Sequence, residues 1–211
     1  MLSVSKLIIA FLSVLSIILL SFTFFLDPDS ELNRLIHYYD FGLCMIFLYD
    51  FFHQLYKREK RWNYFYTYGW LDLLSSIPLV DQFRYARVFR IFRVLRIIKS
   101  FKLLYNFITS NKRESLYGLI VFTSTLILIL SSTLVLYLEK DVGNIKTAED
   151  ALWWSYITIT TVGYGDYFPI TNGGKLAASI LILNGIAIFG AIVSYINERV
   201  NNIKKKSTLG Q

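Results

Sequence analysis

Histidine and cysteine are scarce in this chain of 211 residues, which has two histidines and one cysteine. The histidines, His37 and His53, lack the spacing of metal ligands, so we interpret them as ordinary interfacial residues. Cys44 lies in an apolar stretch, and without a second cysteine it can form no intrachain disulfide, so it is expected to serve as a packing residue. The sequence also has no nucleophile–base pairing and no phosphate-binding loop, and we therefore do not expect an enzyme.

Charge is absent from three long runs, residues 7–26, 115–138 and 176–197, each long enough for a membrane-spanning helix. The whole chain is 55% hydrophobic, with a mean hydropathy of +0.46. Residues 36–56 and 62–80 are also long enough to span but carry acids, and residues 83–104 carry a basic row. A signal peptide is the alternative for residues 7–26, but its apolar core would be shorter and would end in small residues. The sequence predicts an all-α membrane protein with six transmembrane helices.

The basic residues, which give a net charge of +7, predict the orientation of these helices. Six spans place both termini on one side of the membrane, and the loops on that side hold eleven Lys and Arg residues against four on the other. The positive-inside rule then predicts cytoplasmic termini in a multi-pass protein of the plasma membrane. Because most basic residues flank apolar spans or form one row, the charge favours anionic lipids at the cytoplasmic face over nucleic acid.

A shorter uncharged segment, residues 151–165, lies between the last two spans. Its 15 residues are too few for a comfortable span and suit a re-entrant loop. The loop ends in a distinctive motif, Thr161, Val162, Gly163, Tyr164, Gly165 and Asp166.

This motif, which follows the paired Trp153 and Trp154, resembles the selectivity filter of the voltage-gated potassium channel family. A potassium ion must shed its water, and backbone carbonyls of four chains around one axis can replace it, with glycine supplying the unusual backbone conformations. The resemblance therefore implies a homotetramer, potassium bound at Thr161, Val162, Gly163 and Tyr164, and no cofactor besides this permeant ion. It extends from the second span to Asn197 and implies a compact, prokaryotic-like form without cytosolic domains.

The fourth predicted span carries a basic residue at every third position, without a break. The row consists of Arg84, Arg87, Arg90, Arg93, Arg96, Lys99 and Lys102. A basic helix on a membrane surface or on nucleic acid would normally also show charges at i+4 spacing. The strict triplet instead resembles the gating charges of the family's voltage sensor. The resemblance further implies a charge-transfer site formed by Phe47, Asp50 and Asp72, with Asp40 as an outer acid; the alternative for Asp72 is a helix-end residue.

These assignments divide the chain into four parts. Residues 1–102 are expected to form a four-helix voltage sensor, 103–113 an amphipathic linker helix, 114–200 a pore domain with a re-entrant pore helix and filter, and 201–211 a short basic cytoplasmic tail.

The last span contains the candidates for hinge and gate. Gly185 lies where many family members have a hinge glycine, and Gly190 stands in place of the second proline of the Pro-x-Pro kink in animal members. Close helix packing is the alternative role for both glycines. Val193 and Ile196, one turn apart, are candidates for a hydrophobic constriction that gates the pore.

The expected function is passive, voltage-gated potassium conduction, with the basic helix moving outward on depolarisation to open the pore. One alternative keeps this pore but opens it on hyperpolarisation, by a ligand, or without a trigger. Another alternative is a sensor protein that drives an enzyme or a proton path, but such a protein would need no filter.

Overall fold

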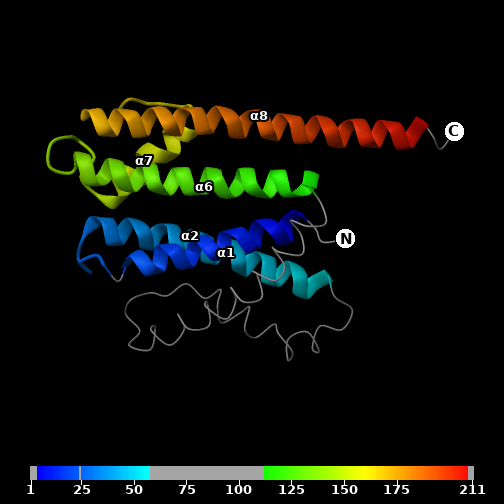
Figure 1. Ribbon diagram of the computed structural model, residues 1–211, viewed down its shortest axis with the longest axis horizontal. Coiled ribbons are helices and arrows are strands. Elements are labelled where there is room, and N and C mark those ends of the chain that lie inside the picture. The colour runs from blue at the N-terminus through cyan, green and yellow to red at the C-terminus, as the bar shows by residue number, and fades with distance from the viewer. Residues whose placement is uncertain (1–3, 24, 58–111, 209–211) are drawn as a thin grey trace. The chain divides into compact units, whose positions relative to one another are not determined.

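The computed structural model describes residues 4–23, 25–57 and 112–208, and these are helical apart from short connections. The helices are α1 (Val4–Thr23), α2 (Glu31–Lys57), α6 (Lys112–Glu139), α7 (Ala148–Ile159) and α8 (Asn172–Thr208), as Figure 1 shows. The described ranges contain no strand, which confirms the all-α part of the prediction. The third and fourth predicted spans, Asp72, the basic row and most of the linker lie outside the described residues.

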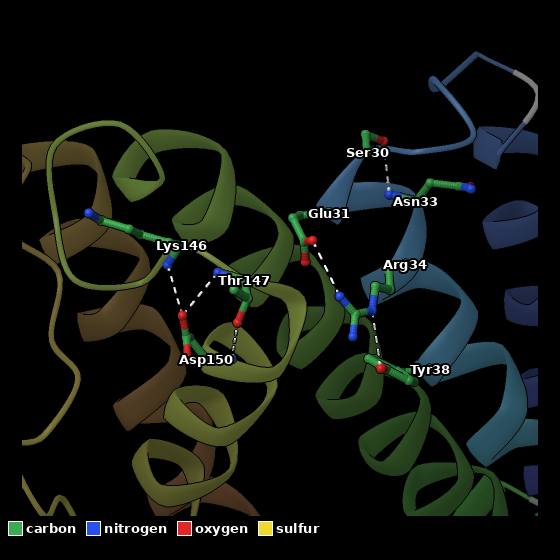
Figure 2. A network of polar contacts seen from close by, with 8 residues as sticks. All are labelled: Ser30, Glu31, Asn33, Arg34, Tyr38, Lys146, Thr147 and Asp150. Atoms are coloured by element: carbon green, nitrogen blue, oxygen red, sulfur yellow. Dashed lines mark hydrogen bonds and ion pairs between the residues drawn. The ribbon is translucent and has the colours of Figure 1, made fainter.

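The chain divides into two compact units, Met1–Phe122 and Thr123–Gln211. In the first unit, α1 packs against α2. The start of α2 is fixed by Ser30, whose hydroxyl accepts a hydrogen bond from the Asn33 N–H at 3.2 Å (Figure 2). In its first turn, Arg34 pairs with Glu31 and also donates to the Tyr38 hydroxyl. These contacts explain why the helix begins at residue 31, five residues before the predicted span.

The core of the first unit contains two of the residues predicted for the charge-transfer site. Phe47 is 2% exposed and Asp40 is 5% exposed, and Asp40 accepts a hydrogen bond from the Ser16 hydroxyl at 3.0 Å. Asp50 is half-buried and accepts a hydrogen bond from Gln54 at 2.7 Å. Cys44 is fully buried, as its predicted packing role requires. The charge-transfer site itself stays a prediction, because Asp72 lies outside the described residues.

The second unit contains most of α6 together with α7 and α8. Within the described residues, two helical segments are long and apolar enough to cross a membrane, Gly118–Glu139 with 22 residues and Asn172–Glu198 with 27. At 1.5 Å per residue they are about 33 Å and 40 Å long, which exceeds the hydrocarbon core of a bilayer. They correspond to the fifth and sixth predicted spans, whereas the apolar part of α1, Ile8–Thr23, is shorter. The total of six spans stays a prediction.

One buried polar contact joins α8 to α6. Asn184 is 8% exposed, and its side-chain amide donates to the Ser124 carbonyl at 3.2 Å. Side-chain hydrogen bonds of this kind hold neighbouring helices together in a membrane, where the apolar effect between helices is weak.

We expect Asn184→Ala to reduce the free energy of unfolding by about 1 kcal/mol, because it removes this interhelical bond. Thermal unfolding of the purified protein in detergent would measure the change. Ser179→Ala is the matched control, since the exposed Ser179 hydroxyl bonds to the Lys175 carbonyl of the same helix and joins no second helix among the described residues. Equal melting temperatures for the two variants would contradict a role of Asn184 in joining the helices.

Candidate functional site

The candidate site begins with α7, whose 12 residues are too few to cross a bilayer. A capping box defines its N-terminus: the Thr147 hydroxyl accepts from the Asp150 N–H, and the Asp150 carboxylate accepts from the Thr147 N–H at 3.0 Å. Both acids of the first turn, Glu149 and Asp150, also suit the positive end of the helix dipole. The predicted re-entrant segment therefore contains a short, well-capped helix.

The C-terminus of α7 leads directly into the predicted filter and holds its inner end. The Thr161 N–H donates to the Thr158 carbonyl at 3.0 Å. The N–H groups of Val162 and Gly163 both donate to the Ile157 carbonyl, at 2.9 and 3.2 Å. Three consecutive backbone donors of the motif are therefore bonded to the last turn of the helix, which fixes their direction.

The backbone of the motif alternates in handedness. Thr161, Gly163 and Gly165 have positive φ values of 60°, 56° and 82°. In an ordinary extended strand, successive carbonyls point to opposite sides. Reversing the handedness at every second residue is a way to turn successive carbonyls toward one side, which is the arrangement that a row of cation sites requires. The two glycines adopt this conformation at little cost, whereas Thr161 does so against its steric preference.

Two aromatic contacts support the outer part of the motif. The Tyr164 ring stacks on the Trp153 ring, with 6.0 Å between centroids and 7° between planes. The Trp153 indole N–H donates to the Asp166 carboxylate at 2.7 Å. One side chain of α7 thus contacts two residues of the motif and sets the separation between helix and filter.

A second carboxylate, that of Asp150, joins α7 to the segment after the motif. It accepts hydrogen bonds from the N–H groups of Lys146 and Thr147 at 3.1 and 3.0 Å (Figure 2) and from the Tyr167 hydroxyl. Partial burial alone would raise the pKa of the Asp150 carboxyl, but these hydrogen bonds lower it below its ordinary value. The same contact raises the pKa of the Tyr167 hydroxyl.

Comparison with known proteins agrees with this geometry. Residues 119–202 match the family model described as an ion channel. Over 112 residues, 52% of this chain, the sequence is 34% identical to potassium voltage-gated channel subfamily A member 4 of Homo sapiens and 33% identical to member 6 of the same species. It is also 34% identical to member 5 of Rattus norvegicus over the same length. The matched region accounts for 17%, 21% and 18% of these three relatives, respectively.

The chain is related to the voltage-gated potassium channels. The resemblance predicted from the filter motif is thereby confirmed, and the matched relatives are channels, as that resemblance implied. The compact, prokaryotic-like character stays a prediction.

A buried carboxylate that we did not single out in the sequence secures the channel domain at the end of α6. Glu139 is fully buried, and it accepts hydrogen bonds from the N–H groups of Ile170 and Thr171, both at 3.0 Å, and from the Thr171 hydroxyl. Gly143 and Gly174 leave room for it, because a Cβ at either position would overlap a Glu139 carboxylate oxygen. Three donors satisfy an anion whose burial would otherwise be costly. The contact ties the end of one apolar helix to the start of the next.

The hinge candidates Gly185 and Gly190 differ in their surroundings. A Cβ at Gly185 would overlap the backbone carbonyl of Ile159, the last residue of α7, whereas a Cβ at Gly190 would meet nothing within 4 Å. Close packing, the alternative role weighed from the sequence, therefore describes Gly185 but not Gly190. The hinge role of both residues, and the gate role of Val193 and Ile196, stay predictions.

The gating-charge residues lie outside the described residues. Four residues of the site, Glu139, Asn144, Asp150 and Tyr167, were missed by the sequence analysis. Only Asp150 had a local signal, the Thr-x-x-Asp spacing of a capping box before an apolar run.

We expect Gly185→Ala to destabilise the channel domain and Gly190→Ala to be neutral or slightly stabilising. The added methyl group must displace the Ile159 backbone at the first position, whereas at the second it gains about 1 kcal/mol of helix propensity. Thermal unfolding of the two variants checks this. If Gly185 served only as a hinge, both alanine variants would melt at or above the wild-type temperature, and that outcome would rule out the packing role.

For Asp150 we expect a stability effect that depends on pH. Because its folded-state pKa lies below the ordinary value of 3.8, its hydrogen bonds stabilise the fold above that pH and are lost as pH falls through the folded-state pKa. Asp150→Asn should therefore lower the melting temperature at pH 7, and its difference from wild type should shrink below about pH 4. Asp141→Asn, at an exposed carboxylate of the loop before α7, is the control. If the difference in melting temperature between wild type and Asp150→Asn stays constant down to pH 3, the assignment is refuted.

Proposed function

We propose that the protein is one subunit of a homotetrameric, potassium-selective channel of the plasma membrane that opens on depolarisation. The observation that carries this proposal is the alternating backbone of Thr161, Gly163 and Gly165 at the end of a short capped helix, between two long apolar helices. Four copies of this ladder around one axis would replace the hydration oxygens of potassium, with no cofactor besides the permeant ion. Thr161, Val162, Gly163 and Tyr164 supply the oxygens.

Exposed apolar side chains support assembly in a membrane. On α8, Leu183 is 67% exposed and Phe189 is 71% exposed in the isolated chain, and on α6 Leu130 is 56% exposed. Apolar surfaces of this size are covered by lipid or by other protein chains. A fourfold arrangement offers both, because each subunit faces its neighbours on one side and lipid on the other. The excess of Lys and Arg on the side of both termini supports a cytoplasmic location of the tail beside anionic lipids.

Voltage dependence is proposed from the basic row. If Arg84, Arg87, Arg90 and Arg93 cross most of the field in four chains, about 16 charges move, which corresponds to roughly 37 kcal/mol per 100 mV as an upper limit. This energy is ample for a gate whose states differ by a few kcal/mol. With a negative interior the row is drawn inward, and depolarisation releases it outward. The linker then transmits the movement to the inner end of α8 near Val193 and Ile196.

Purified protein in a planar bilayer tests selectivity. In asymmetric potassium and sodium, the current should reverse close to the potassium equilibrium potential. Gly165→Asp places a carboxylate and a Cβ where the backbone has a φ of 82°, so it should lose potassium preference or conduction. A wild-type reversal potential that follows sodium, or no current in any gradient, would overturn the proposed function.

The same bilayer recordings test the sensor. Arg90→Gln should make the conductance–voltage curve shallower or shift it along the voltage axis, because one charge per subunit no longer moves in the field. Lys205→Gln, in the predicted cytoplasmic tail, removes a charge outside the field and should leave the slope unchanged. An open probability that is flat with voltage, or one that rises on hyperpolarisation, would contradict opening by depolarisation.

A further inference from the structure

The loop between α6 and α7 contains an asparagine that bonds to the backbone just beyond the filter. The Asn144 amide nitrogen donates to the Asp166 carbonyl at 2.8 Å. Its amide oxygen accepts from the Phe168 N–H at 3.4 Å. The carbonyl of residue i and the N–H of residue i+2 face the same side of an extended chain, so a single amide can satisfy both as a neighbouring strand would. Asn144 therefore supplies one unit of strand pairing to residues 166–168.

The loop that carries Asn144 is fixed on both sides. Before it, the N–H groups of Val142 and Gly143 donate to the Glu139 carbonyl at 3.0 and 2.7 Å. After it, Ile145 is fully buried, and the N–H groups of the next two residues bond to the Asp150 carboxylate. The amide is thus held at a set position by residues that belong to α6 and α7. A group held in this way can orient another segment instead of following it.

Asp166 is the residue on which this loop and α7 converge. Its carboxylate accepts from Trp153, and its carbonyl accepts from Asn144. It directly follows Gly165, whose φ of 82° can change at little steric cost because glycine has no side chain. The N–H of the peptide group after Asp166, that of Tyr167, donates to the Asp166 carboxylate at 3.1 Å, so the side chain held by Trp153 holds one end of this peptide group. The bond from Asn144 holds the other end, the Asp166 carbonyl.

We propose that Asn144 is a positioning residue that keeps the outer end of the filter in the conducting conformation during sustained opening. The inference rests on the proposed function, since it concerns the lifetime of a conducting filter. Loss of the amide leaves this peptide group held only through its N–H, which lowers the cost of rotating the Asp166 carbonyl, and Gly165 permits the filter to leave the conducting arrangement. A potassium ion in the outermost site opposes that rotation, because it attracts the filter carbonyls.

The experiment compares Asn144→Ala, Asn144→Asp and Lys146→Ala in a planar bilayer with wild type. The channels are held open by a depolarising step, and the rate at which the current decays is measured at low and high external potassium. Asn144→Ala should decay roughly 2- to 10-fold faster than wild type at low potassium, the range that one or two hydrogen bonds supply. High potassium should reduce this difference. Asn144→Asp keeps the acceptor for Phe168 but sets a carboxylate against the Asp166 carbonyl, so it should decay at least as fast as the alanine variant.

Lys146→Ala changes an exposed side chain of the same loop while its N–H still bonds to Asp150, and it should decay like wild type. A role confined to folding would lower the melting temperature of Asn144→Ala but leave its decay rate and potassium dependence unchanged, and that result overturns the proposal. Equal decay for all variants overturns it as well. If wild type carries no potassium current, the proposed function has failed, a result separate from equal decay in a conducting protein.

Discussion

The structure of the channel domain depends on one backbone constraint, the positive φ values at Thr161, Gly163 and Gly165. A row of carbonyls that face one side requires this alternation, and an isolated chain would not keep it. At Thr161 the conformation costs on the order of 1–2 kcal/mol, because a β-branched side chain crowds the neighbouring carbonyl. Such a cost persists only where the surrounding contacts over-determine the backbone. At the start of the motif the capped helix α7 provides these contacts, because its Ile157 and Thr158 carbonyls accept hydrogen bonds from the N–H groups of residues 161–163. The loop before α7 and the buried Glu139 hold the segment that follows the motif.

The sequence predicted the parts of this arrangement that depend on local patterns. Charge-free runs predicted the helices observed as α6 and α8, and six adjacent residues predicted a filter motif directly after a short helix. Gly163 and Gly165 were expected to have special backbone conformations because glycine tolerates them. Thr161 was not expected to have a special conformation, because its residue type does not indicate a positive φ. Its conformation follows from the end of α7, where the Thr158 carbonyl holds its N–H.

Contacts between segments that are far apart in the sequence could not be predicted from the sequence alone. Glu139 was noted only as the charge that ends a span, although its carboxylate bonds to residues 31 and 32 positions away. Asn144 carries no local signal, because its partners are 22 and 24 positions away. Gly185 was weighed as a hinge or a packing residue, and only the tertiary structure reveals the Ile159 carbonyl beside it. A single sequence without related sequences does not show which distant positions are in contact.

The two ends of the filter are held by different kinds of interaction, and this difference has a physical consequence. The inner end depends on backbone hydrogen bonds to α7, whose last residue packs against Gly185. Such contacts contain no ionisable group, so they respond to movement of α8 and not to the composition of the solution. The outer end depends on the side chains of Asp150, Asp166 and Asn144. The hydrogen bonds to the Asp150 carboxylate, whose pKa they lower, weaken as this group protonates. If the motif is the filter of a channel, a change of pH on its outer side should therefore act on the outer end, while movement of α8, which contains the predicted gate residues, should act on the inner end.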